Sequence, residues 1–100
     1  MREPLDFRKG RVVQSTQGRD RGYFFLVTEE TGNGLVMIAD GRLHRLDHPK
    51  KKKTKHLRPS PVKMETYQQL LTENRLKDSD IRRFLGENGF DPGQPLCKED

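Results

Sequence analysis

The sequence predicts a mostly β protein with an α-helical C-terminus, in which five short strands form a small, strongly bent barrel and two short helices follow. Three observations support this fold class. Short apolar and β-branched runs alternate with glycine-containing turns up to about residue 60. Asn-Gly and Asp-Gly pairs, which readily form hairpin turns, separate some of these runs. Beyond them, apolar residues recur at the helical spacings of three and four.

The first three predicted strands are bounded by clear turn residues. Residues 10–16 (GRVVQST) form a short β-branched strand, and the polar loop that follows, residues 17–22 (QGRDRG), contains two glycines that permit a sharp turn. The strongest strand is predicted over residues 23–30 (YFFLVTEE). An Asn-Gly turn then leads into its returning partner, residues 35–39 (LVMIA).

Two further strands complete the predicted sheet. Residues 42–46 (RLHRL) follow an Asp-Gly turn and alternate as a half-buried edge strand does, and residues 56–59 (HLRP) supply a last short strand. Five short strands joined by hairpins favour a closed barrel, because closure hides strand edges, and we expect an SH3-like barrel. Residues 23–27 and 35–39 are apolar at both alternating sets of positions, so the outer face of this hairpin also needs cover.

The C-terminal third is predicted to supply that cover. Ser60 before Pro61 is typical of a helix start, and the helix should run to about Leu76. Its apolar side is formed by Met64, Tyr67, Leu70 and Leu71. A second, shorter helix is predicted from a cap at Asp78 or Ser79. Its apolar residues are Ile81, Phe84 and Leu85, and Gly86 or Gly89 ends it.

These elements divide the chain into four parts. We expect an N-terminal arm (residues 1–9), a barrel (10–60), a helical extension packed on the barrel (61–90) and a disordered tail (91–100) that contains two prolines and a glycine.

The basic charge is concentrated in the front of the chain. Lys and Arg total 20 against 15 acidic residues, a net charge of +5. Residues 1–60 hold 14 basic and 7 acidic side chains, a net charge of +7, whereas residues 61–100 hold 6 and 8, a net charge of −2. Such a field attracts polyanions, so nucleic acid is the first partner to consider.

Residues 10–30 (GRVVQSTQGRDRGYFFLVTEE) resemble the KOW motif, with a glycine, paired valines, a loop with spaced glycines and then a hydrophobic strand. The segments DGRLHRL and PKKKKTKHL make the match similar to eukaryotic-type large-subunit ribosomal KOW proteins and their small bacterial relatives. The resemblance covers roughly residues 8–60. It implies an SH3-like barrel and RNA binding through the loop arginines and the lysine run.

The predicted RNA-binding residues are basic side chains on loops and edges, together with one aromatic residue. They are Arg19, Arg21, Tyr23, Arg42, Arg45, Lys50, Lys51, Lys52, Lys53, Lys55 and Arg58, with Gly18 and Gly22 as structural glycines. Cations neutralise phosphates, guanidinium groups suit bidentate contacts, and a tyrosine can stack on an unpaired base. The alternatives are a solvated lysine linker, ordinary surface arginines, one of them tied to Asp20 or Asp47, and a tyrosine that belongs to the core.

Other functions find little support in the sequence. His44, His48 and His56 have neither a CxxC pair nor a carboxylate at ligand spacing, so we expect no metal. No phosphate-binding loop, nucleophile elbow or paired acid-base carboxylates indicate an enzyme or a cofactor. Cys97 lies in the polar tail and is interpreted as incidental. No apolar run suggests a signal or a membrane span, so we expect a cytoplasmic protein.

We therefore expect a monomeric, non-catalytic protein that binds RNA, namely rRNA or the ribosome, mainly through phosphates. The alternative is a protein-interaction module of the transcription or translation machinery. Burial of Met64, Tyr67 and Leu71 against the barrel would indicate a self-contained domain, whereas their exposure would favour a protein partner.

Overall fold

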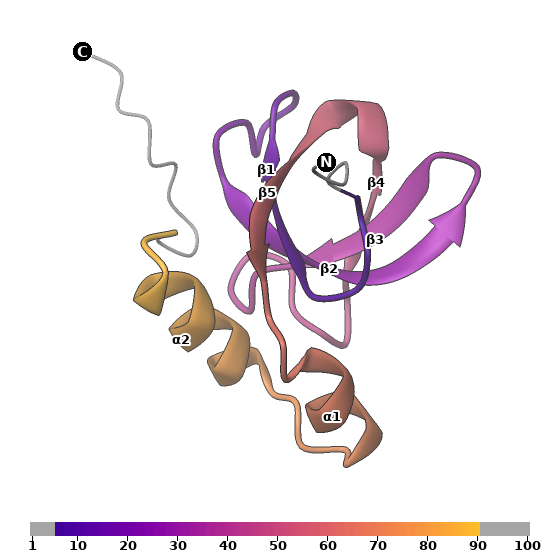
Figure 1. Cartoon of the computed structure of the whole chain (residues 1–100). Helices are drawn as coiled ribbons and strands as arrows, with labels where there is room; N and C mark the ends of the chain where they lie inside the picture. Colours follow the sequence, from indigo (N-terminus) through magenta and orange to yellow (C-terminus); the bar gives the residue numbers. More distant parts are fainter. Residues whose placement is uncertain (1–5, 91–100) are drawn as a thin grey trace, which may run out of the picture.

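Figure 1 shows the computed structural model of the chain, which describes residues 6–90. Its elements are β1 (Arg11–Ser15), β2 (Phe24–Gly32), β3 (Leu35–Ala39), β4 (Lys50–Lys53), the 3-10 helix η1 (Thr54–His56), β5 (Leu57–Lys63), α1 (Tyr67–Thr72) and α2 (Asp78–Glu87). The strands form one antiparallel sheet in the order β4-β3-β2-β1-β5, which curls but does not close. The predicted class, a mostly β fold with two short C-terminal helices, is confirmed.

The two alternating sets of strand residues fill two separate cores. An inner cluster inside the curled sheet contains Val13, Phe25, Val27, Val36, Ile38 and Leu57. An outer cluster contains Val12, Phe24, Leu26, Ala39, Met64, Tyr67, Ile81 and Leu85. Successive residues of a strand point to opposite faces, so the paired valines of β1 and the paired phenylalanines of β2 each contribute one residue to each cluster.

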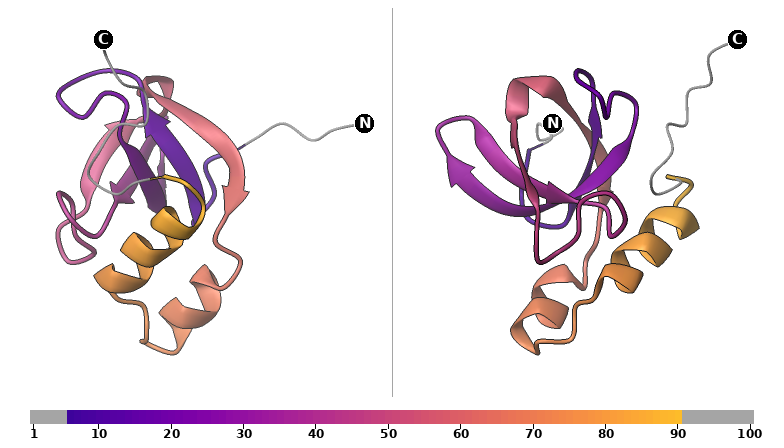
Figure 2. Two further views of the ribbon diagram at one scale, coloured as in Figure 1. Left: turned by 90° about the vertical axis from the view of Figure 1, so that its left-hand side faces the viewer. Right: turned by 180° about the vertical axis from the view of Figure 1, so that it is seen from behind.

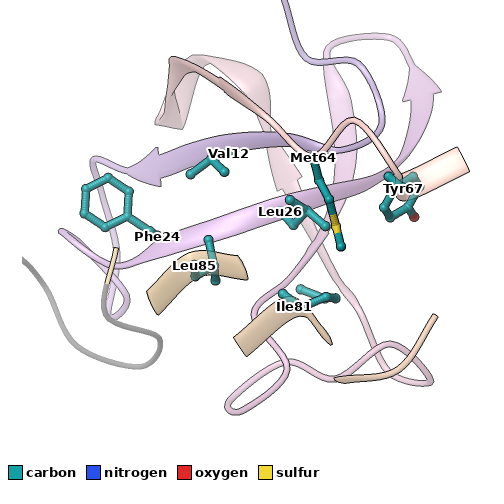
Figure 3. Close-up of a cluster of buried hydrophobic side chains, with 8 residues drawn as sticks. Val12, Phe24, Leu26, Met64, Tyr67, Ile81 and Leu85 are labelled. Atoms are coloured by element: carbon teal, nitrogen blue, oxygen red, sulfur yellow. The ribbon is translucent and has the colours of Figure 1, made fainter. Parts of the chain in front are cut away.

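The helices cover the outer face of the sheet. Ile81 and Leu85 of α2 are fully buried, and Figure 3 shows both below Leu26 of β2. Tyr67 at the start of α1 is also buried, and its hydroxyl donates a hydrogen bond of 2.9 Å to the carbonyl oxygen of Thr28. Cover for a two-sided apolar hairpin is thus provided by the C-terminal segment, as its sequence predicts.

The fourth strand lies at a different place from the one predicted. Residues 42–46 are not a strand but part of the loop between β3 and β4 (residues 40–49). The buried carboxylate of Asp40 accepts hydrogen bonds from the backbone N–H groups of Arg42 (2.9 Å) and His44 (3.0 Å), which folds the chain back on itself. The strand is instead β4, formed by the lysine run that was expected to be a loop, and Lys50–Lys53 pair with β3.

The predicted start of the first helix at Ser60 is also wrong. Ser60 and Pro61 belong to β5, an edge strand that pairs only with β1 and therefore tolerates proline. The Ser60 hydroxyl accepts a hydrogen bond from the N–H of Val62 within β5, and α1 begins only at Tyr67. The second helix begins at Asp78, so its cap is Lys77 and not Asp78 or Ser79 as predicted, and the Asp80 carboxylate accepts a hydrogen bond of 2.9 Å from the N–H of Lys77.

Two bulged registers help to bend the long hairpin. The pairing of β2 with β3 shifts between Val27 and Glu29 and again before Gly32, and each extra residue increases the local twist.

As Figure 2 shows, the β1–β2 loop and the β4–β5 connection lie at the end of the sheet away from α1. No helix within residues 6–90 is long and apolar enough to cross a membrane. The predicted disordered tail and the first five residues of the predicted arm lie outside the described residues.

Candidate nucleic-acid interface

A glycine-bounded loop, residues 16–23, carries two of the predicted arginines. It is closed at its base by hydrogen bonds between Ser15 and the loop, with the N–H of Gly22 donating to the Ser15 carbonyl at 2.8 Å. Gly18 and Gly22 have φ angles of 93° and 90°, a backbone region that disfavours side chains with a Cβ atom. Arg19 and Arg21 are both exposed on this loop. The spaced glycines of the sequence therefore shape the loop that presents the two arginines.

The residue between these arginines, Asp20, is buried and organises the loop. It accepts a hydrogen bond of 2.7 Å from the Ser15 hydroxyl and bonds of 2.9 and 3.0 Å from the ammonium groups of Lys52 and Lys50. Lys52 also donates to the carbonyl oxygen of Gln17 at 2.9 Å. These contacts join the β1–β2 loop to the edge strand β4 across the open side of the curled sheet.

The electrostatic balance at Asp20 favours the ionised form. Burial alone raises the pKa of this carboxyl group, but the hydrogen bonds from Ser15, Lys52 and Lys50 outweigh burial and lower the pKa from 3.8 to about 2. Asp20 therefore stays charged at neutral pH, and Lys50 and Lys52 compensate that charge within the fold.

The lysine run is divided between two roles by the alternation of β4. Lys52 is buried, with 8% of its surface exposed, and Lys50 is half-buried; both point toward Asp20. Lys51 and Lys53 point to the other side and are exposed. Lys52, which was predicted to bind RNA, is therefore a buried structural residue, and Lys50 is also paired with Asp20.

Arg58 and Arg21 come together at a shallow groove of about 210 Å³. The groove is also lined by Gln14, Ser15, Thr16 and Gly22. It exists because β1 pairs with β5, which sets Gln14 opposite Arg58, and because the β1–β2 loop folds back over the end of β1. Two guanidinium groups in one groove are suited to an anion of the size of a phosphate.

A second groove, of about 350 Å³, lies between the start of η1 and the β2–β3 hairpin. It is lined by Lys53, Thr54 and Lys55 together with the tip of the β2–β3 hairpin, where Asn33 and Gly34 have positive φ angles. The N–H of Thr54 donates a hydrogen bond of 2.8 Å to the carbonyl oxygen of Gly34, which holds the two segments together. The backbone N–H of Thr16 bonds to His56, so η1 also adjoins the arginine loop.

We define the basic end as the exposed cations of the β1–β2 loop and of the β4–β5 connection. They are Arg19, Arg21, Lys53, Lys55 and Arg58. Within residues 6–90, none of these five side chains makes an ion pair or a hydrogen bond. Arginines elsewhere in the fold differ: Arg11, Arg45, Arg75 and Arg83 each pair with a carboxylate. Exposed lysines without an ion pair also occur elsewhere within residues 6–90, at Lys9, Lys51 and Lys77. The basic end is distinguished by its exposed arginines without an ion pair or hydrogen bond, Arg19, Arg21 and Arg58, which are joined there by two lysines.

Two predicted residues, Arg42 and Arg45, belong to a different part of the surface. Their loop packs on α2, because Asp78 accepts a hydrogen bond of 2.7 Å from the N–H of Leu46 and Arg82 bonds to the carbonyl oxygen of Gly41 at 2.6 Å. Arg45 lies 3.6 Å from the Asp78 carboxylate. Arg45 is therefore paired with a carboxylate of α2 and does not belong to the surface that carries Arg19 and Arg21.

Tyr23 is half-buried and packs against the inner cluster, so its ring is committed at least in part to the core. The residues that the sequence reasoning missed are the structural partners Ser15 and Asp20 and the groove residues Gln14 and Thr16. Of these residues only Asp20 carried a signal in the sequence, namely its position between two arginines with which an acid can pair.

Comparison of the chain with protein-family models gives no match, and comparison with curated proteins gives none either. The resemblance to KOW proteins therefore remains a prediction.

Proposed function

We propose that this protein is a non-catalytic RNA-binding protein of the KOW type, associated with rRNA or the ribosome in the cytoplasm, and that the basic end is its RNA-contacting surface. The observation that carries the proposal is a group of five exposed, unpaired cations at one end of the sheet, four of which line two grooves. Each such cation can neutralise a phosphate and release a counterion, because no internal carboxylate competes for it.

The finer fold assignment belongs to the same proposal. The strand order β4-β3-β2-β1-β5, with a 3-10 turn between β4 and β5, supports an SH3-like barrel that is open at one side. In this assignment Asp20 and its two lysines bridge the open side.

The alternative function, a protein-interaction module, has one specific observation in its favour. Met64 and Tyr67 are buried in the outer cluster, but Leu71 of α1 is 42% exposed. Within residues 6–90 Leu71 and Leu43 are the only large hydrophobic residues that are exposed, and a few such residues are ordinary for a protein surface, so we favour RNA as the partner.

The test measures RNA affinity against salt concentration by fluorescence anisotropy. The probe is an RNA hairpin with a single-stranded tail, which offers both forms of RNA. The variant Arg21→Ala/Lys55→Ala/Arg58→Ala should lose about tenfold or more in affinity, and the slope of log K against log salt should flatten by about two units.

The matched control is Arg75→Ala/Lys77→Ala/Arg83→Ala, which removes the same charge from exposed positions in α2 and in the segment between α1 and α2. Its affinity should change much less than that of the basic-end variant. Equal losses in the two variants would reduce the proposal to non-specific attraction by net charge, and salt-independent binding would reject the phosphate mechanism.

A further inference from the structure

All seven aromatic residues of the chain are engaged in packing. Phe24, Phe25 and Tyr67 are buried in the two clusters, and the half-buried Phe7, Tyr23, Phe84 and Phe90 pack against them. Phe24 and Phe90 are in ring contact, with centroids 4.5 Å apart. Proteins that hold single-stranded nucleic acid commonly stack its bases on exposed rings. Within residues 6–90 no phenylalanine or tyrosine ring is fully exposed, so the surface lacks the fully exposed rings of this kind on which unpaired bases commonly stack.

The groove between β1, β5 and the β1–β2 loop instead has the chemistry of a sugar-phosphate site. Arg21 and Arg58 supply guanidinium groups for one phosphate. The amide nitrogen of Gln14 donates to the carbonyl oxygen of Gly22 at 3.2 Å, which leaves the amide oxygen as an acceptor. The hydroxyl of Thr16 has no partner within the described residues and can both donate and accept.

We propose that this groove binds the backbone of helical RNA, with Arg21 and Arg58 on a phosphate and with Thr16 and Gln14 on a neighbouring ribose 2′-hydroxyl. The inference rests on the proposed function and adds the form of RNA that is bound. Helical RNA displays its 2′-hydroxyl groups and phosphates along a wide, shallow minor groove, so it can be held by its backbone without access to the bases. A 2′-hydroxyl contact also separates RNA from DNA.

The experiment measures the affinity of the 100-residue chain for three probes at one salt concentration. They are an RNA duplex of about 16 base pairs, a length typical for proteins that bind double-stranded RNA, a DNA duplex of the same sequence, and an unstructured uridine strand with the same number of phosphates. The RNA duplex should bind about tenfold tighter than the other two, because only the duplex presents the ordered 2′-hydroxyl groups.

Two variants locate the effect in the groove. Arg21→Ala/Arg58→Ala should weaken binding of all three probes, since every probe has phosphates. Thr16→Val keeps the shape of the side chain, and the Thr16 hydroxyl makes no hydrogen bond within the described residues, so the variant should fold normally. The variant should lower the affinity for the RNA duplex about three- to tenfold, the usual range for one hydrogen bond, and should leave the affinity for the DNA duplex unchanged.

The outcomes separate this inference from the proposed function. If the uridine strand binds as tightly as the RNA duplex or tighter, or if Thr16→Val affects RNA and DNA equally, the helical-RNA site is wrong although RNA binding at the basic end stands. If no probe binds, both proposals fail. If the RNA duplex is preferred and Thr16→Val removes part of that preference, the groove is the site.

Discussion

Replacing Lys52 by methionine should destabilise the fold, although it sits in a run of four lysines that looks entirely solvated. Methionine retains most of the aliphatic stem, so the change mainly removes the ammonium group. That group makes two hydrogen bonds of 2.9 Å, one to the Asp20 carboxylate and one to the Gln17 carbonyl oxygen. Its loss leaves both acceptors short of a donor in a region where Asp20 is only 4% exposed.

The size of the effect follows from what remains around Asp20. Removing one partner of a buried ion pair costs about 3–5 kcal/mol when nothing replaces it. Here Ser15 and Lys50 still donate to the carboxylate, so we expect a smaller loss of about 2–3 kcal/mol in the free energy of unfolding. A loss of that size in a domain this small lowers the melting temperature by about 10–20 °C.

Urea unfolding at neutral pH, followed by circular dichroism, measures the loss. The control is Lys51→Met, which makes the same chemical change on the exposed side of β4 and should alter the unfolding free energy by less than about 0.5 kcal/mol. If the two variants unfold at the same urea concentration, then the Lys52 ammonium is not held as described and the loop is not anchored by Asp20.

Three further predictions concern stability. Because the pKa of Asp20 is 3.8 unfolded and about 2 folded, stability from this group is complete above about pH 4 and falls by about 2 kcal/mol as the pH drops to 2; acid unfolding of Asp20→Asn should lack that component. Ile81→Ala should cost about 2–4 kcal/mol in urea unfolding, and the exposed Leu71→Ala under about 1; similar costs would mean that α2 is not docked. Gly32→Ala should cost about 1 kcal/mol, from backbone strain alone, because the φ angle of Gly32 is near 80° and an added Cβ atom meets nothing. Gly41→Ala should cost clearly more, because Gly41 has a similar φ angle and an added Cβ atom there also meets the Asp78 carbonyl of α2. Equal melting temperatures of the two variants would contradict this contact.

The strands that could be predicted are those whose pattern is decided locally. The Val12-Val13 pair, the Phe24-Phe25 pair and the Asn-Gly turn each specify strand or hairpin by β-branching, aromatic content or positive φ. The apolar character of both faces also predicts a covering layer, which the outer cluster provides. These features depend only on neighbours in the sequence.

The fourth strand could not be predicted because it is decided by partners far along the chain. The alternating residues 42–46 would suit a strand, but Asp40 turns the backbone, and Asp78 and Arg82 of α2, some 32 to 41 residues away, hold the loop. Four consecutive lysines have a low strand propensity. They form β4 because the edge of β3 offers backbone pairing and because Lys50 and Lys52 find Asp20 about 30 residues earlier.

The candidate site could be predicted from the sequence only in part. Composition indicates that residues 19–58 are basic, but it does not separate cations that are consumed by the fold from those that remain available. That division depends on the alternation of side chains along β4, in which Lys52 points inward and Lys53 outward, and on whether a carboxylate such as Asp78 lies near the cation. Pairing is a property of three-dimensional neighbours, so a count of positive residues overestimates the surface that can meet a polyanion.

Asp20 connects the stability of the fold with the charge of the proposed interface. An acid between Arg19 and Arg21 would, if exposed, offset part of their positive field and compete with a phosphate for the guanidinium groups. Because the carboxylate is instead buried against Ser15 and Lys52, its charge is neutralised by a buried lysine and not by the exposed arginines. The same contacts fix the loop that carries the two arginines, which reduces the entropy that these side chains and their backbone lose when a ligand binds. A single buried acid can therefore both anchor the β1–β2 loop to β4 and keep its own negative charge away from the exposed cations of the basic end.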